Sequence, residues 1–386
     1  MMCWRRSVSR MATGVEKGRV SVMSLPDDFG LTPLQTLARV ADPTPPGGFV
    51  QFWTRWADAV WSKPAKFEAF RLDRDASLGQ PGAPGVTHTI VAHDGVRCGC
   101  RVILPVRAPG QIRGVVITAH GYTLQPYEPL TDDNPWSGGD RPIAVVKVRV
   151  RGYPGSHFST GDLSLKPGGY IVQGIEKAES WVLAGAASDY AAAIRAARDM
   201  FGQAVPIMLH GESFGAAIAI IAASGIGSRE RFPRLAIGLP TLGDWTWRLR
   251  RLDAINKPGI GHEVVRYLRQ NASQTAAVTS TLRLFDTVVH ARRITSPVVC
   301  KLAERDEVVP APTAAAVYNA FGADPGRKWR FVTRFGHCSP ESAGADSAEV
   351  FADLRRHAQF EKLIGDFLDA TRDIGDVMKQ WEQSCA

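Results

Sequence analysis

The sequence predicts an α/β fold in which a mostly parallel central sheet carries helices on both faces. Short apolar runs of strand length lie at residues 115–119, 143–150, 205–209, 235–239 and 297–302. Strands buried on both faces are apolar along their whole length, and strands that alternate with helices indicate βαβ units. The chain of 386 residues, 45% hydrophobic and 22% charged, is long enough to bury a large core without disulfides.

The composition argues against several classes of function. The net charge of +8 is too mild to indicate nucleic-acid binding, and no tract interleaves basic and aromatic residues. No apolar run reaches the roughly 18 residues of a membrane span, and the basic N-terminus lacks the apolar segment of a secretory signal. We therefore expect a cytoplasmic protein with reduced thiols and with no metal or cofactor. Cys98 and Cys100 are expected to be buried on one face of a strand.

The chain before residue 86 is expected to consist of an extension and a helical arm. Residues 1–24 are expected to form a disordered extension. Residues 25–85 hold two helical segments, at 32–41 and 49–62. The second segment carries an aromatic stripe at helical spacing. Such a stripe favours packing against a core over a platform for sugars.

Residues 86–371 are expected to form the main domain, followed by a tail at 372–386. An Asp-Gly turn at 93–95, between two alternating runs, predicts a β-hairpin. Two long segments, 154–180 and 243–293, do not fit the alternation of strands and helices, and we expect them to cover the sheet as a lid or cap. Further helices are expected at 188–200, 216–224, 313–321 and 350–371, and a last strand is expected at 329–333.

Residues 211–215 (Gly-Glu-Ser-Phe-Gly) stand between the apolar run at 205–209 and an apolar helical segment. A strand, a G-x-S-x-G turn and a helix, in that order, are typical of a nucleophile elbow, in which the serine is strained. Both glycines are needed because larger side chains two residues before and after the serine would clash. Ser213 is therefore a candidate nucleophile.

A serine nucleophile needs a base, and the base needs an acid that orients it. After such an elbow, the acid and then the histidine follow in the chain, each in a loop past a strand. The strand at 297–302 is followed by Glu304, Asp306 and Glu307, of which we choose Asp306 because a short carboxylate in a turn suits a fixed orienting group. His337 follows the next strand, so both loops open at the same edge of the sheet.

The oxyanion hole of such a site needs two N–H donors. One is expected from the backbone of Phe214, directly after the nucleophile, and the other from Tyr122, in the loop after the strand at 115–119. Two further histidines lie near these loops. His120 is expected to shape the oxyanion site, and His210 to pack behind the elbow.

Taken in order, these motifs resemble the acetyl xylan esterase and cephalosporin C deacetylase family of carbohydrate esterases. The marks of the resemblance are Leu25-Pro26, the aromatic segment 49–56, His120-Gly121-Tyr122, Val150-Arg151-Gly152, the glycine-rich stretch 168–175, the helix at 189–198, the elbow, Phe285-Asp286, Asp306 with Pro310, residues 317–319 and Gly336-His337. The resemblance covers roughly residues 25–368. It implies an α/β-hydrolase fold, hydrolysis of short acyl esters, chiefly acetyl, and cytoplasmic homo-oligomers, often hexamers.

The resemblance supports a catalytic triad of Ser213, Asp306 and His337 and backbone oxyanion donors at Tyr122 and Phe214. Departures from the family pattern occur beside this site. Where the family has Gly and Gln around the serine, this chain has Glu and Phe. Tyr replaces Gln after the arginine-glycine pair, and Cys replaces Glu after the histidine. We expect an intact triad and an altered substrate pocket, in which Phe214 narrows the acyl side or faces a larger apolar acceptor.

The sequence therefore predicts a serine esterase for short-chain acyl esters of sugars or other small molecules. One alternative is an acyl-transferring or deacylating tailoring enzyme of secondary metabolism with the same triad. Another is a peptidase of the prolyl-oligopeptidase type, for whose propeller domain the chain is short. A third is a non-catalytic binding protein on a hydrolase scaffold. Neither the alcohol portion of the substrate nor the acyl chain length can be read from the residues.

Overall fold

A nine-stranded sheet lies at the centre of the described part of the chain, in the order β1-β2-β3-β5-β4-β6-β7-β8-β9. The computed structural model describes residues 29–71, 85–105, 112–122, 130–133, 136, 141–153, 156, 169–251, 257–337 and 344–385. The strands are β1 (Glu68–Ala69), β2 (His88–Val91), β3 (Arg97–Ile103), β4 (Gly114–Ala119), β5 (Ile143–Val148), β6 (Ile207–Glu212), β7 (Leu235–Gly238), β8 (Val298–Arg305) and β9 (Lys328–Phe335). From β5 across to β9 every pair is parallel, whereas β1, β2 and β3 pair antiparallel. The predicted hairpin and mostly parallel sheet are confirmed.

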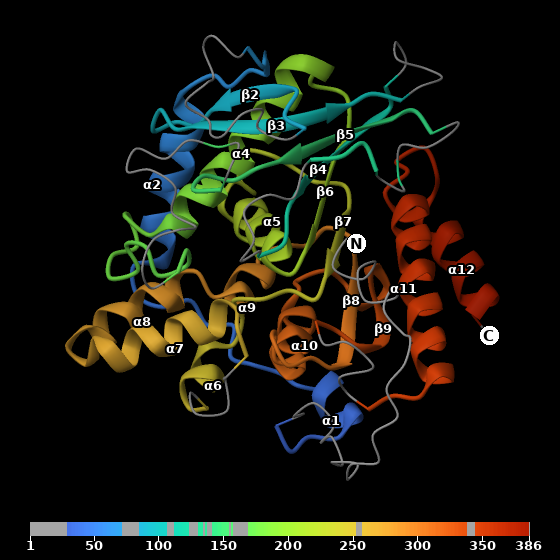
Figure 1. Ribbon diagram of the computed structural model, residues 1–386. Coiled ribbons are helices and arrows are strands. Elements are labelled where there is room, and N and C mark those ends of the chain that lie inside the picture. Colours follow the sequence, from blue (N-terminus) through green and yellow to red (C-terminus); the bar gives the residue numbers. More distant parts are fainter. Residues whose placement is uncertain are drawn as a thin grey trace, which may run out of the picture.

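Helices cover both faces of this sheet (Figure 1). The helices are α1 (Pro33–Leu37), α2 (Phe49–Ser62), α4 (Val182–Phe201), α5 (Phe214–Gly225), α6 (Trp245–Leu249), α7 (Ile260–Gln270), α8 (Thr275–Leu284), α9 (Thr287–Ala291), α10 (Ala311–Ala320), α11 (Ser347–Phe367) and α12 (Ile374–Cys385), with short 3-10 turns η4 (Ala272–Gln274) and η5 (Pro325–Arg327). The helices α4, α5, α9 and α10 share one apolar cluster with the sheet, and α11 and α12 share a second cluster on the opposite face. None of the described helices is both long and apolar enough to cross a membrane.

Alternate residues of each central strand serve these two faces. On β4, Val115 and Ile117 belong to the cluster with α4 and α5, whereas Val116 belongs to the cluster with α11. The strands are apolar throughout because both faces are covered. By the same alternation, the even-numbered residues of β6 and the odd-numbered residues of β8 direct their side chains toward α11.

Two helices extend beyond the residues expected from the sequence. The helix expected at 188–200 begins six residues earlier, at Val182. Ser188 therefore lies buried inside α4, where its hydroxyl donates to the Ala184 carbonyl at 2.9 Å. The tail expected at 372–386 contains α12, whose Val377 and Met378 are buried against α11. In both cases apolar residues at helical spacing find a neighbour that the local sequence does not reveal.

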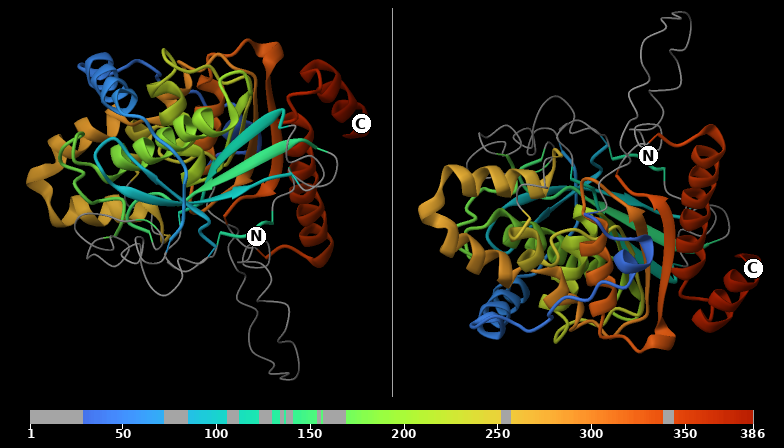
Figure 2. Two further views of the ribbon diagram at one scale, coloured as in Figure 1. Left: turned by 90° about the horizontal axis from the view of Figure 1, so that it is seen from above. Right: turned by 90° about the horizontal axis from the view of Figure 1, so that it is seen from below.

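The N-terminal arm is fastened to the domain by its aromatic stripe. Phe49, Phe52, Trp53 and Trp56 on α2 are at most 8% exposed, which confirms packing and not a sugar platform. Figure 2 shows α2 against the helices that cover the same face of the sheet. The helix expected at 32–41 is only the five-residue α1, and residues 1–28 lie outside the described residues.

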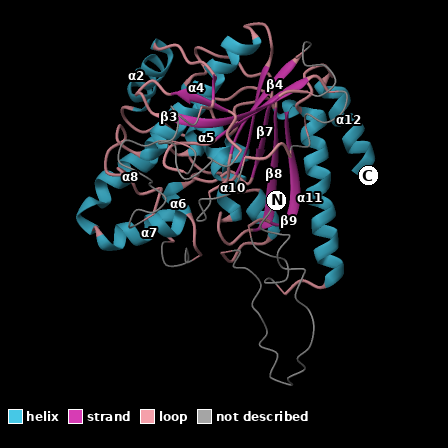
Figure 3. Ribbon diagram, turned by 45° about the horizontal axis from the view of Figure 1, so that its top comes forward, coloured by secondary structure: helices cyan, strands magenta, loops and turns pink. Residues whose placement is uncertain are grey.

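The segment 243–293 is helical, as expected. Figure 3 shows α6, α7 and α8 together on one side of the sheet, away from α11 and α12. Most of the other insertion, at 154–180, falls outside the described residues, and its part from residue 169 onward forms consecutive turns. Cys98 and Cys100 are buried free thiols on β3, as predicted.

Candidate active site

Ser213 lies in the sharp turn between β6 and α5. Its φ of 55° and ψ of −113° are strained for a residue with a side chain. The Ser213 N–H donates to the Gly238 carbonyl at 2.8 Å, which fastens the turn to β7. A Cβ at Gly211 would lie 2.3 Å from the carbonyl carbon of Gly215, and one at Gly215 would lie 2.4 Å from the Ala119 oxygen. The predicted strained turn and its need for two glycines are confirmed.

Asp306 and His337 are in direct contact. Asp306 Oδ2 lies 2.6 Å from His337 Nδ1. The second carboxylate oxygen, Oδ1, accepts the N–H groups of Val308 and Val309, each at 2.9 Å. These three bonds satisfy a carboxylate whose side chain is 1% exposed, so its orientation is fixed.

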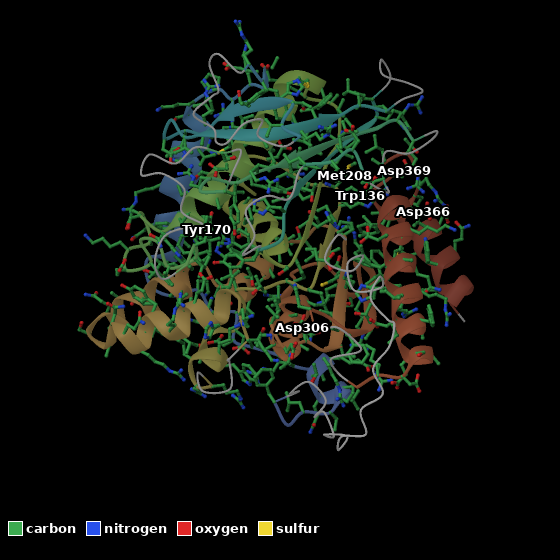
Figure 4. The ribbon with its side chains drawn as sticks, in the orientation of Figure 1. Trp136, Tyr170, Met208, Asp306, Asp366 and Asp369 are labelled. Carbon is green, nitrogen blue, oxygen red and sulfur yellow. The ribbon has the colours of Figure 1, made fainter. Side chains whose placement is uncertain are left out.

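The neighbouring acids of this loop do not share that position. Glu307 Oε2 lies 3.2 Å from Nζ of Lys257, a residue of the segment 243–293. Figure 4 shows Asp306 beside α10, which begins directly after the loop. Among Glu304, Asp306 and Glu307, it is Asp306 whose carboxylate bonds to His337.

His337 follows β9 and keeps 25% of its side chain accessible. Because Nδ1 bonds to Asp306, Nε2 is the nitrogen left for proton transfer. Burial alone would lower the pKa of His337, but the Asp306 charge and its hydrogen bond outweigh burial and raise this pKa above 6.5. Since β6, β8 and β9 are parallel, Ser213, Asp306 and His337 all follow strands that end at one edge of the sheet.

The two expected oxyanion donors belong to adjacent segments. The Phe214 N–H is the first of α5, and the first N–H groups of a helix have no acceptor within that helix. Tyr122 lies in the loop after β4, and its ring packs edge-on against the Phe214 ring, with centroids 5.4 Å apart. The loop and the elbow are therefore in contact, as an oxyanion hole requires.

The ring of Phe214 does not face a substrate. It is fully buried, with the rings of Tyr170 and His120 at centroid distances of 5.8 and 6.4 Å in addition to Tyr122. The expectation that Phe214 faces an apolar acceptor is therefore wrong. Its ring instead packs against the aromatic side chains around it. Tyr153 is another departure from the family pattern, and its ring centroid lies 4.7 Å from that of Tyr170.

The segment 243–293 reaches the loop after β4 through the carboxylate of Glu263. Tyr122 donates its hydroxyl to Glu263 Oε2 on α7 at 2.6 Å. The Ile171 N–H donates to the same carboxylate at 3.3 Å and to the Tyr122 hydroxyl at 3.2 Å. Burial raises the pKa of Glu263. Figure 4 shows Tyr170, next to Ile171, on the side of the molecule where α7 and α8 lie. No local pattern in the sequence predicts this contact.

Both nearby histidines are held neutral. His120 Nε2 accepts the Val150 N–H at 3.4 Å, and burial lowers the pKa of His120 to about 3. His210 Nδ1 bonds to the Thr118 hydroxyl at 2.9 Å, its ring lies 4.2 Å from that of Trp136, and burial lowers its pKa to about 3. The expectation that His210 packs behind the elbow is confirmed.

An ion pair beneath the elbow was not predicted. Glu212 Oε1 lies 2.5 Å from Lys301 Nζ, and the Lys301 side chain is only 3% exposed. A lysine inside the apolar strand run 298–302 is an available sequence signal, because such a residue is seldom buried without a partner.

As for metals, the described residues contain no group of three or more His, Cys, Asp or Glu placed to hold an ion.

Comparison with known proteins identifies the family. The family model of acetyl xylan esterase (AXE1) matches residues 26–350. The chain belongs to the acetyl xylan esterase family. This esterase is therefore a carboxylic ester hydrolase, and its family acts on acetyl esters. No curated protein sequence matches it significantly.

Solved structures agree on the fold of this esterase. It is similar to the acetyl xylan esterase from Paenibacillus sp. R4, with a TM-score of 0.62 and 18% identity over 85% of this chain and 98% of that one. It is also similar to acetyl xylan esterase 1 from Thermoanaerobacterium sp. JW/SL YS485, with a TM-score of 0.59 and 18% identity over 85% of this chain and 97% of that one. The fold is that of the α/β-hydrolases, as predicted.

Proposed function

We propose that this chain is a serine esterase that removes short acyl groups, chiefly acetyl, from sugars or other small molecules through an acyl-enzyme. Ser213 is the nucleophile, His337 is the general base and acid, and Asp306 orients the imidazole. The main support is the 2.6 Å contact between Asp306 Oδ2 and His337 Nδ1, at the sheet edge where the strained Ser213 turn lies.

In the first half of the reaction, Ser213 Oγ attacks the ester carbonyl carbon while its proton passes to His337 Nε2. The carbonyl oxygen becomes an oxyanion and accepts the N–H groups of Phe214 and Tyr122. One such donor is worth about 2.7–4 kcal/mol of barrier in a known hydrolase. The alcohol leaves with the proton from Nε2. Water then attacks the acyl-enzyme by the same route and releases the carboxylic acid and the free serine.

The aromatic side chains beside the oxyanion loop support a small acyl group. Tyr122, Tyr170 and Phe214 pack edge-on against one another, with centroids 5.4–6.0 Å apart. Such close packing occupies the space beside the loop and is costly to open, because protein interiors are packed about as densely as organic crystals. We expect acetyl esters to be turned over faster than longer esters.

Replacement of the nucleophile tests the proposed function. With p-nitrophenyl acetate as substrate, Ser213→Ala is expected to lower kcat by at least about 10³-fold, because attack by the hydroxyl is lost. A panel of p-nitrophenyl esters from two to eight carbons, run beside acetylated xylo-oligosaccharides and cephalosporin C, identifies the acyl and alcohol preferences. Turnover of Ser213→Ala at the wild-type rate would exclude the proposed triad.

Acyl transfer is the second candidate, since Glu212 and Phe214 stand where the family has Gly and Gln beside the nucleophile. Product analysis in the presence of added alcohols and amines separates the two: hydrolysis gives free acid, and transfer gives a new ester or amide.

We also propose a homo-oligomer, on the family resemblance, and sedimentation of the purified enzyme tests it.

A further inference from the structure

Three residues on adjacent strands form a row directly beneath the nucleophile. Glu212, the last residue of β6, pairs with Gly238 on β7, and Gly238 pairs with Lys301 on β8. In a parallel sheet, residues paired in this way direct their side chains to the same face. Here that face is the one covered by α11.

Gly238 opens the path between the two charged side chains. A Cβ at this position would lie 3.1 Å from Glu212 Cγ and 3.2 Å from its Cδ. Such contacts are tighter than a side chain normally makes, so any other residue would push the Glu212 side chain away. The missing side chain lets Glu212 Oε1 cross the width of β7 and reach Lys301 Nζ at 2.5 Å.

Lys301 is held in place from the opposite side by α11. Its Nζ lies 3.4 Å from His357 Nδ1 and 5.2 Å from the centre of the Phe360 ring. Because the ammonium can only donate, Nδ1 of His357 is the acceptor, and its proton lies on Nε2. A buried lysine with a carboxylate, an imidazole and an aromatic face around it is fixed in position.

The same contacts lead to the strand that carries the base. His357 Nε2 lies 3.3 Å from both Asp353 Oδ2 and the Phe335 carbonyl oxygen. Asp353 Oδ1 accepts the N–H of Arg334 at 3.0 Å. These contacts fasten the end of β9, two residues before His337, to the helix that holds Lys301.

Within the described part of the chain, the charges that act on the pKa of His337 are those of Asp306, Glu212 and Lys301. Glu212 and Asp306 raise the pKa of His337, and Lys301 lowers it. Burial would raise the pKa of Glu212 itself, but Lys301 lowers it to about 2, so Glu212 is ionised at every working pH. His210 on β6 and Glu361 on α11 are the other titratable groups near Glu212.

We propose that Glu212 is a second carboxylate of the active site, a positioning residue that Lys301 holds through the gap at Gly238 so that its charge stabilises the imidazolium of His337. This role rests on the proposed triad. It assigns a function to the residue at which this chain departs from the family's Gly, and it makes Lys301 the group that holds this carboxylate in place.

Removal of the charge alone tests this role. Glu212→Gln keeps the shape of the side chain, and we expect the acid limb of kcat/KM to move to lower pH by about half a unit to one unit. We expect kcat to fall about three- to tenfold with KM changed less, because the weaker base removes the serine proton more slowly. The titration of His337, followed by NMR of histidine-labelled enzyme, should shift by the same amount without any substrate.

Two further variants make the outcome decisive. The double variant Glu212→Gln with Lys301→Met removes both charges of this pair, and we expect its acid limb to return most of the way to the wild-type position. Glu307→Gln removes a carboxylate of the Asp306 loop that pairs with Lys257, and we expect no shift. An unmoved acid limb and His337 titration in Glu212→Gln, in an enzyme whose activity still requires Ser213, would overturn the role of Glu212. Loss of the Ser213 requirement would instead overturn the proposed triad.

Discussion

The two oxygens of Asp306 have different partners, and both of them act as acceptors. Oδ1 accepts two backbone N–H groups, from Val308 and Val309, and Oδ2 faces His337 Nδ1. Because the N–H groups can only donate, the atom at the Oδ1 position must be an acceptor. Oδ2 of the carboxylate also accepts, so Nδ1 of the neutral imidazole is the donor and carries the proton, and Nε2 is left free to accept the serine proton.

This arrangement makes the effect of Asp306→Asn predictable. The asparagine oxygen must take the Oδ1 position, so its NH2 group faces His337 Nδ1. That nitrogen then becomes the acceptor, and the proton moves to Nε2, where it blocks the base. We expect kcat to fall about 10³- to 10⁴-fold with the fold intact, as for the same substitution in a serine protease triad. Ester hydrolysis and thermal unfolding measure the two effects, and activity within about tenfold of wild type would show that Asp306 does not orient the base.

The pH dependence of the wild-type enzyme follows from the same contact. His337 must be neutral to accept the proton of Ser213. Its pKa is raised above 6.5, so kcat/KM is expected to be full above this pKa and to fall as the pH drops through it. His120 and His210, whose pKa values are about 3, stay neutral over the same range and contribute nothing to the limb. A pH profile of kcat/KM with acetyl esters measures the pKa of His337. An acid limb with its midpoint below about pH 6 would contradict the raised pKa.

At the scale of elements, the insertion helix α7 is coupled to the oxyanion loop through Tyr122 and Glu263. The two residues are 141 positions apart, and their 2.6 Å hydrogen bond also involves the Ile171 N–H. The loop proposed to supply one oxyanion donor is thereby tied to the segment 243–293. A fixed loop matters because an oxyanion hole acts through donors that are in place before the reaction.

Removal of the Tyr122 hydroxyl tests this coupling. Tyr122→Phe keeps the ring and the backbone N–H, so we expect kcat to fall roughly tenfold through loosening of the loop, and the free energy of unfolding to drop by about 1–2 kcal/mol. Glu263→Gln keeps an acceptor for the hydroxyl and should retain most of the activity. Steady-state kinetics and chemical denaturation measure both variants. Equal activity of Tyr122→Phe and wild type would mean that the loop is rigid without α7.

The sequence predicted the elements of this fold better than the contacts between them. Buried strands are visible as apolar runs, and the order of Ser213, Asp306 and His337 predicted where each would lie on the sheet. The start of α4 was missed because residues 182–187 contain no polar capping group. Lys301 stands out within the apolar run 298–302, but its partner Glu212 is set by the register of β6, β7 and β8, which no local pattern predicts.

At the scale of the whole molecule, the N-terminal arm is part of the domain core. Trp53 on α2 donates its indole N–H to the Leu284 carbonyl at 3.0 Å, and its ring packs 5.0 Å from Phe285 and 4.7 Å from His290. These partners belong to the end of the segment 243–293, so one side chain joins the arm to the insertion. Arm and domain should therefore unfold together.

Trp53→Ala tests whether they do. The substitution leaves a large cavity between α2, α8 and α9, and we expect the free energy of unfolding to fall by about 3–5 kcal/mol. Val50→Ala on the same helix, at a side chain that is 58% exposed, is the matched control and should change it by no more than about 0.5 kcal/mol. Circular dichroism, tryptophan fluorescence and esterase activity, followed during one thermal ramp, should report one shared transition that moves to lower temperature in Trp53→Ala. A separate early transition of the arm, with activity lost only at the wild-type temperature, would show that the arm is an independent unit.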